Sequence, residues 1–141
     1  MKLLALDSSA AACSVALWDD REEKTGSPIV AHRGKYMERG QSEALIPLVD
    51  SVMEETGWIF SDLDRLGVTV GPGSFTGVRV GLAAARGLAL AGRLPLVGVT
   101  SFEAIAFEAW SGDGDGSSRP SDTMLVALSA GRSDLYIQIF A

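Results

Sequence analysis

The segment at residues 71–81 is the first candidate for chemistry, because glycine-rich loops that precede helices often bind phosphate. It reads Gly-Pro-Gly-Ser-Phe-Thr-Gly-Val-Arg-Val-Gly. A P-loop needs a lysine after its last glycine, where Val78 stands here, and the glycines are one residue too widely spaced for the dinucleotide fingerprint G-x-G-x-x-G. Two interpretations remain: an anion held by the free N–H groups at the helix start near Arg79, or a purely structural turn. The residues of that turn are Gly71, Pro72, Gly73, Ser74 and Thr76.

The other reactive side chains do not form a recognisable catalytic set. A metalloprotease site needs paired histidines on a metal ion, and His32 is the only histidine of the chain. Nucleophilic hydrolysis by Ser8, Ser9 or Ser74 has no base available except His32. The single Cys13 excludes an internal disulfide, suits a reducing compartment and is predicted to face the core. We therefore predict no catalytic residue and no metal site.

The composition indicates a globular protein with an acidic surface. Of the 141 residues, 47% are hydrophobic, and no run approaches the roughly 20 apolar residues that cross a bilayer. The start of the chain lacks the features of a secretory signal, so we expect a cytoplasmic protein without membrane contact. The net charge of −6, from 12 basic and 18 acidic residues, argues against direct binding of nucleic acid by this chain alone. The one basic stripe that the spacing predicts is Arg79, Arg86 and Arg93, interpreted as a solvated face or as ion-pair partners of another protein.

Hydrophobic periodicity places these residues on a series of short elements. The predicted elements are strands at 3–6, 14–18 and 28–33, a polar loop at 34–40, a helix at 42–56 that Ser42 could cap, a strand at 66–70, a helix at 74–91, a strand at 96–99 and a helix at 101–110. This order resembles one half of an α/β fold of the actin-like ATPase or ribonuclease-H-like type. In that fold, helices flank a mixed central sheet.

A polar segment near the end of the chain separates two predicted regions of unequal size. Residues 111–122 contain no hydrophobic residue and are predicted to form a flexible linker. Residues 124–128 and 135–140 are predicted to form a β-hairpin, which is only marginally stable by itself. We therefore expect an N-terminal subdomain at 1–110 and, at 123–141, the start of a second subdomain that is incomplete. Either the chain is a shortened form, or the hairpin packs on the first subdomain or on a partner.

The helix at 74–91 carries a repeat of small residues. Gly77, Gly81 and Ala85 recur every four positions, with Ala84 and Gly87 close to the same face. Because each glycine costs a helix about 1 kcal/mol relative to alanine, three of them predict the close approach of another backbone. The sequence leaves open whether that backbone is a second helix or the sheet beneath.

The signature at residues 71–81 resembles that of the bacterial TsaB family, formerly called YeaZ. Further similarity follows in the same order: residues 1–9 resemble the family's first strand, 12–17 its second strand, 41–49 its first helix, and 97–102 its next strand and turn. The family's first helix usually begins with His-Ser-Glu, whereas this chain has Gln41-Ser42-Glu43. The similarity covers residues 1–110 and resumes at 123–140.

This resemblance implies a role in making threonylcarbamoyladenosine in tRNA. TsaB-like proteins resemble a catalytic relative, TsaD, and pair with it through their N-terminal helices, and the ATPase TsaE joins that pair. By resemblance, the chain is a non-catalytic scaffold or activating subunit that meets tRNA indirectly and holds no cofactor alone. ATP or ADP would be bound only at the level of the complex, and a homodimer is possible when TsaD is absent. The implied partner interface comprises Leu45, Val49, Val52, Met53, Gly77, Val78, Gly81, Ala84, Ala85 and Leu88.

The alternative hypothesis is a stand-alone nucleotide hydrolase or glycoprotease-like peptidase of the actin-like superfamily. In such ATPases a carboxylate at the end of the first strand assists Mg²⁺. Asp7 holds that position here, followed by Ser8 and Ser9 in place of a glycine turn. The family's second phosphate loop, usually Asp-Ala-Arg, corresponds to Ser129-Ala130-Gly131, which lacks both charges. A self-sufficient ATPase site is therefore not expected, and Asp7, Ser8 and Ser9 are at most a candidate for cofactor binding.

Overall fold

The structure, a computed structural model, describes residues 1–22, 27–111, 123–131 and 134–141. Its centre is a five-stranded sheet in the order β3-β2-β1-β4-β5. The strands are β1 (Lys2–Ala10), β2 (Ala12–Asp19), β3 (Ile29–Tyr36), β4 (Arg65–Thr69) and β5 (Leu96–Val99). Strand β2 pairs antiparallel with β1 and β3, whereas β4 pairs parallel with both β1 and β5. The sheet is therefore mixed, as predicted.

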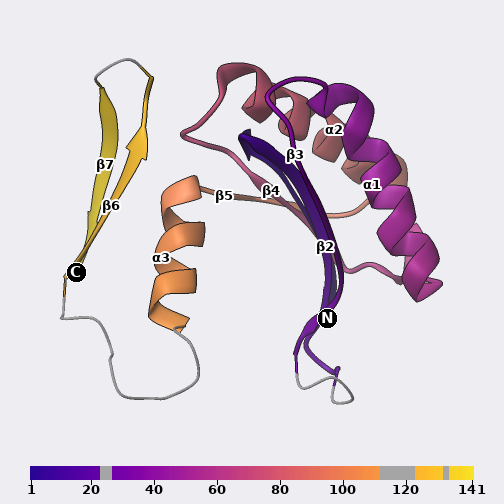
Figure 1. Cartoon of the computed structure of the whole chain (residues 1–141). Helices are drawn as coiled ribbons and strands as arrows, with labels where there is room; N and C mark the ends of the chain where they lie inside the picture. The colour runs from indigo at the N-terminus through magenta and orange to yellow at the C-terminus, as the bar shows by residue number, and fades with distance from the viewer. Residues whose placement is uncertain (23–26, 112–122, 132–133) are drawn as a thin grey trace.

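Two long helices cover one face of this sheet, α1 (Gln41–Thr56) and α2 (Phe75–Gly92) (Figure 1). Helix α1 packs on β2 and β3, and α2 packs on β1 and β4. A single 3₁₀ turn, η1 (Phe60–Asp62), follows α1. Alternate residues of the strands point toward the helices, so Leu4, Val15 and Leu66 are fully buried beneath them. The main core is thus the layer between the sheet and α1 with α2.

A smaller packed region lies on the opposite side of the sheet (Figure 1). Helix α3 (Ser101–Ser111) packs there against a two-stranded hairpin formed by β6 (Met124–Ser129) and β7 (Leu135–Phe140). Phe102, Ala106 and Val126 form its buried centre. Both strands of the predicted hairpin are confirmed. Of the predicted linker at 111–122, Ser111 is the last residue of α3, and residues 112–122 lie outside the described residues.

Several boundaries differ from the predictions: β1 and β2 are longer than predicted, with β1 reaching Ala10, and β3 and the start of α1 also differ. The sequence predicts a loop from Gly34, whereas strand β3 continues to Tyr36. The reason is that the backbone groups of these residues pair with β2 as far as Ala12, and this pairing does not depend on the type of side chain. Ser42 does not cap α1, since its hydroxyl donates to Glu43 inside the helix. The residue before the helix is instead Gly40, at a φ of 92° that suits glycine. Among the described residues, no helix is long and apolar enough to cross a membrane.

Candidate functional site

The glycine-rich segment wraps around the end of strand β1. A Cβ on Gly73 would lie 2.2 Å from the carbonyl oxygen of Ser9, and a Cβ on Gly77 would lie 1.9 Å from that of Ser8. The backbone N–H of Ser74 donates to the same Ser9 oxygen at 2.6 Å. Only glycine leaves room for the strand to reach the helix so closely. The backbone that approaches is the chain's own sheet, which answers the question that the sequence left open.

Ser8 fixes this contact from the strand side. Its side chain is buried, and its hydroxyl donates to the carbonyl oxygen of Gly77 at 2.8 Å. A Cβ on Gly81 would lie only 2.7 Å from the same hydroxyl oxygen. Ser74 caps α2, since its hydroxyl accepts from the N–H of Gly77 at 3.3 Å. Ser8 therefore helps to hold the end of β1 against α2.

Hydrogen bonds hold the start of α3 beside this turn. Gly71 adopts a φ of 94°, and its carbonyl oxygen accepts from the N–H of Ser101 at 2.9 Å. The N–H and hydroxyl of Thr100 donate to the Glu103 carboxylate at 2.7 and 2.8 Å, and the N–H of Glu103 donates back to the Thr100 hydroxyl. The two bonds from Thr100, the backbone one first, hold the pKa of Glu103 below its usual value. This reciprocal capping fixes where α3 begins.

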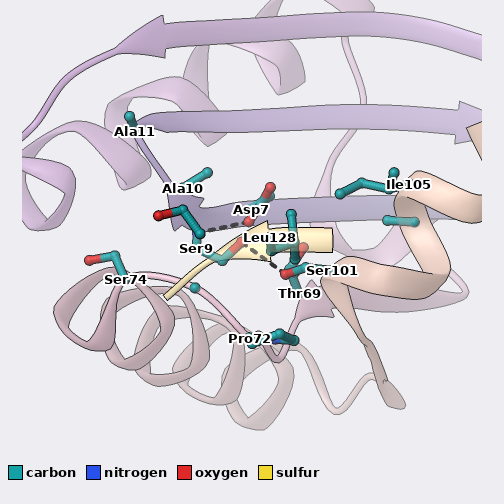
Figure 2. Close-up of a pocket in the computed structure, with 13 residues that line it drawn as sticks. Asp7, Ser9, Ala10, Ala11, Thr69, Pro72, Ser74, Ser101, Ile105 and Leu128 are labelled. Carbon is teal, nitrogen blue, oxygen red and sulfur yellow. Dashed lines mark hydrogen bonds between the residues drawn. The ribbon is translucent and has the colours of Figure 1, made fainter. Parts of the chain in front are cut away.

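These elements enclose a cleft of about 530 Å³ between the end of β1, the glycine turn, α3 and β6 (Figure 2). The N–H of Ser9 donates to the Asp7 carboxylate at 2.8 Å, and the hydroxyl oxygens of Ser9 and Ser101 lie 3.4 Å apart. Asp7 is the one charged side chain among the described lining residues. The lining residues are Asp7, Ser9, Ala10, Ala11, Thr69, Pro72, Gly73, Ser74, Ser101, Ala104, Ile105, Leu128 and Ser129.

The cleft is poorly suited to the phosphates of a nucleotide. A magnesium–phosphate group needs several oxygen ligands and cationic partners, whereas the described lining offers one carboxylate that already accepts from Ser9. Ser129, at the position of the family's acidic residue, accepts instead from the N–H of Gly131 at 3.3 Å. No group of three His, Cys, Asp or Glu residues suited to a metal ion occurs in the described part of the chain. The lining supports contacts to a small, mainly uncharged group.

The single cysteine does not line this cleft. Cys13 is fully buried in the core, as predicted. Burial, with the charge of Asp7 as a smaller contribution, raises the pKa of its thiol. The thiol therefore stays protonated at neutral pH, and the thiolate is the form that reacts.

The residues predicted for a partner interface on α1 lie inside the chain's own core. Leu45, Val49, Val52 and Met53 are at most 7% exposed. They form the apolar stripe by which α1 packs on β2 and β3 of its own chain. A stripe that covers the sheet cannot also contact a partner.

The residues predicted for the interface on α2 are buried or half-buried in the chain. Gly77, Gly81 and Ala85 are buried on the inner face of the helix. Ala84 and Leu88 are half-buried and pack against the main core. Val78, also half-buried, lies against the turn, because a Cβ on Gly71 would be 3.4 Å from its side chain.

The opposite side of α2 is open to solvent. Leu90 is 83% exposed, and a Cβ on Gly87 would have no atom within 4 Å. We define the outer face of α2 as the exposed uncharged residues that lie on one side of the helix, opposite Gly77 and Gly81: Thr76, Ala83, Gly87, Leu90 and Ala91. Two of the three arginines predicted as a stripe flank it: the guanidinium of Arg79 lies 3.5 Å from the ring centre of Phe75, and Arg86 is exposed. Arg93 departs from that stripe because it caps the helix end at a φ of 54°.

Comparison with known proteins identifies relatives for nearly the whole chain. The sequence model of the family described as TsaD, tRNA N6-adenosine threonylcarbamoyltransferase, matches residues 35–140. The tRNA threonylcarbamoyladenosine biosynthesis protein TsaB of Escherichia coli K12 is 35% identical, covering 96% of this chain and 53% of the relative. The TsaB protein of Haemophilus influenzae is 34% identical over 96% of this chain and 52% of its own length. A solved structure of YeaZ from Pseudomonas aeruginosa, 29% identical, covers 98% of this chain and 59% of that one with a TM-score of 0.82.

Two facts follow from these comparisons. The YeaZ structures belong to the actin-like ATPase fold family, so the predicted fold is confirmed. The chain spans about half the length of the curated relatives that it matches.

Proposed function

This chain belongs to the family of TsaB (YeaZ) and TsaD proteins, and from that premise we propose that it is a non-catalytic subunit in the synthesis of threonylcarbamoyladenosine in tRNA. It works in the cytoplasm, and the chemistry resides in a partner of the TsaD type. The observation that carries the non-catalytic role is the cleft, whose described lining has Asp7 as its one charged side chain. An enzyme that transfers an acyl group to tRNA needs more charged groups than this lining supplies.

The outer face of α2 is the surface through which the chain pairs with that partner. Its small residues let another helix approach closely, and its lack of charge lowers the cost of removing water. Leu90 supplies an exposed apolar contact at one end and Phe75, 69% exposed, lies near the other. The same face serves for a homodimer when the partner is absent, and a TsaE-type ATPase joins the assembled pair.

Size-exclusion chromatography with light scattering tests this pairing. The chain is measured alone and mixed with the TsaD protein of the same organism, as wild type and as Ala83→Arg. We expect a one-to-one complex that Ala83→Arg weakens by at least tenfold, because a long cation replaces a small residue at the contact. The matched control is Ala109→Arg, which changes another exposed alanine, on α3. A complex that forms equally well with Ala83→Arg would place the partner on another surface.

Activity separates this proposal from a stand-alone enzyme. Transfer of threonylcarbamoyl to tRNA by the purified chain without a TsaD protein would show that the non-catalytic role is wrong. The cleft around Asp7 is the feature that a nucleotide hydrolase or a peptidase would use. Calorimetry with Mg-ATP is expected to show no micromolar binding. Binding that Asp7→Asn removes would favour the hydrolase instead.

A further inference from the structure

Helices α1 and α2 carry charges of opposite sign. The sequence of α1 contains acidic residues and no Lys or Arg, whereas that of α2 contains arginines and no Asp or Glu. The two helices pack against each other on the same face of the sheet (Figure 1). We define the acidic row as Glu43, Asp50 and Glu54 of α1, and the basic row as Arg79 and Arg86 of α2. All five side chains are exposed.

Each row follows one side of its helix. The acidic row lies opposite the buried stripe of α1, because its members are seven and four residues apart and a helix turns once every 3.6 residues. Arg79 and Arg86 are also seven residues apart and share one side of α2. Glu43 and Asp50 have this same separation, which spans about 10 Å along a helix. Two charges of one row can therefore meet two charges of the other when the helices lie against each other.

Small uncharged residues separate the two rows. Thr76 and Val80 line a hollow of about 370 Å³ together with the first residues of α1, so this edge of α2 faces α1. Arg79 and Arg86 lie toward the other edge of α2, because each residue advances the helix by about 100°. Across the surface that the two helices present to solvent, the order is therefore the acidic row, the outer face of α2 and the basic row.

Neither row is neutralised within the part of the chain that the structure describes. The one ion pair of α1 or α2 in that part joins Glu55 to Arg33 of β3 at 2.7 Å, outside both rows. Glu54 stands in the last turn of α1, where a negative charge opposes the helix dipole, so helix stability does not account for it. The guanidinium of Arg79 stacks on the ring of Phe75, and this contact holds the cation at the surface. Both rows are available to a binding partner.

We propose that this two-helix surface is complementary to itself and binds a second copy of the chain, with the acidic row of each copy facing the basic row of the other. In such a twofold contact both copies use the same surface, so one pairing of an acidic row with a basic row implies the second. The twofold axis passes through the small residues between the rows and places α1 of one copy over α2 of the other. This inference rests on the proposed function, in which α2 is the pairing face, and it assigns the residues that select the partner.

Charge favours this arrangement over the other twofold packing of the same helices. If α2 of one copy lay on α2 of the other, the two basic rows would meet, and like charges across an interface oppose association. Placing α1 over α2 instead brings carboxylates to guanidinium groups, which form strong hydrogen-bonded pairs. Ala83 and Gly87 between the rows are small enough to let the helices approach closely. A different protein would fit the basic row equally well only if it presented an acidic helix.

Sedimentation equilibrium with charge-reversal variants tests this pairing. One variant combines Arg79→Glu with Arg86→Glu, and the other combines Glu43→Lys with Asp50→Lys. Each variant alone should raise the Kd of the dimer at least about tenfold, because charges of the same sign then face each other. An equimolar mixture should restore the dimer, since each variant carries one sign on both helices and finds the opposite sign only in the other variant. Higher salt should weaken the wild-type dimer.

The controls reverse exposed charges outside both rows. They are Arg65→Glu on β4 and Glu108→Lys on α3, and both should dimerise like the wild type. Circular dichroism shows whether each variant is folded, and the single variants Arg86→Glu and Asp50→Lys replace a double variant that is not. Loss of the dimer in each variant and its return on mixing support the proposal. A wild type that stays monomeric, variants that dimerise like the wild type, or folded variants that mixing fails to restore would each overturn it.

The proposed function is tested separately in the same series. Light scattering of the wild type mixed with the TsaD protein shows whether the two form a one-to-one pair. If they do, the proposed function stands even when the self-pairing is overturned. A dimer that is restored by mixing the two variants, with no TsaD pair, supports the charge pairing and contradicts the proposed function.

Discussion

The two faces of α2 carry similar small residues for opposite reasons. On the inner face, Gly77 and Gly81 meet Ser8, and each lacks the space for a single added carbon. On the outer face, Gly87 has free space around it. A small residue on the inner face is therefore required by a close contact, whereas a small residue on the outer face borders open space. The comparison shows that the spacing of glycines predicts close approach but does not identify the side of the helix on which it occurs.

The largest effect is expected from Gly77→Ala. The new Cβ would lie 1.9 Å from the carbonyl oxygen of Ser8, which is backbone and cannot rotate away. We expect the free energy of unfolding to fall by about 3 kcal/mol, at the upper end for overpacking, despite the better helix propensity of alanine. Urea unfolding followed by circular dichroism measures this change. Stability equal to that of the wild type would mean that the strand end does not rest on the helix.

Gly81→Ala is expected to cost less, because the obstructing atom is the Ser8 hydroxyl, 2.7 Å from the new Cβ. We expect a loss of about 1–2 kcal/mol. In a Ser8→Ala background the hydroxyl is absent, so the same change should be nearly neutral. A double-mutant cycle in urea measures this coupling. Additive losses would show that Ser8 and Gly81 do not share one contact.

Ser8→Ala alone tests the polar part of the inner contact. It removes the buried hydrogen bond from the Ser8 hydroxyl to the carbonyl oxygen of Gly77. The expected loss is about 1 kcal/mol, typical for a single hydrogen bond. Because the residue is structural, pairing with the TsaD protein should be unchanged under native conditions. If the Ser8→Ala variant is fully folded but pairs more weakly with the TsaD protein, Ser8 has a role beyond packing.

Much of this arrangement could be predicted from local sequence. The length of α2 and the succession of strands and helices along the chain follow from the hydrophobic period, and both are confirmed. The end of β3 was missed because its polar residues resemble a loop, while the pairing with β2 depends on backbone groups. The hydrophobic periodicity of α1 correctly predicts an apolar stripe that includes Leu45 and Val49. It does not indicate that the chain's own sheet covers this stripe.

The cleft could be predicted only in part. Asp7 and Ser9 were identified because they follow the first strand. Ser101, Ile105 and Leu128 were not, since they come from two distant elements that only the folded chain brings to the same cleft. No local sequence pattern indicates that α3 and β6 line the same cleft. The outer face of α2 was missed for a different reason, because Gly87 was grouped with the buried glycines of the same helix.

The smallest expected effect, that of Gly87→Ala, tests the comparison from the other side. A Cβ at this position would have no atom within 4 Å, so no steric cost opposes the change. Alanine is the better helix former, so the free energy of unfolding should rise by about 0.5–1 kcal/mol. Thermal unfolding of the isolated chain measures this gain, with Gly77→Ala as the matched glycine on the inner face. If a partner helix approaches at Gly87, the same variant should also weaken pairing while it stabilises the chain. A loss of stability instead would mean that Gly87 is packed like Gly77, and the distinction between the two faces would fail.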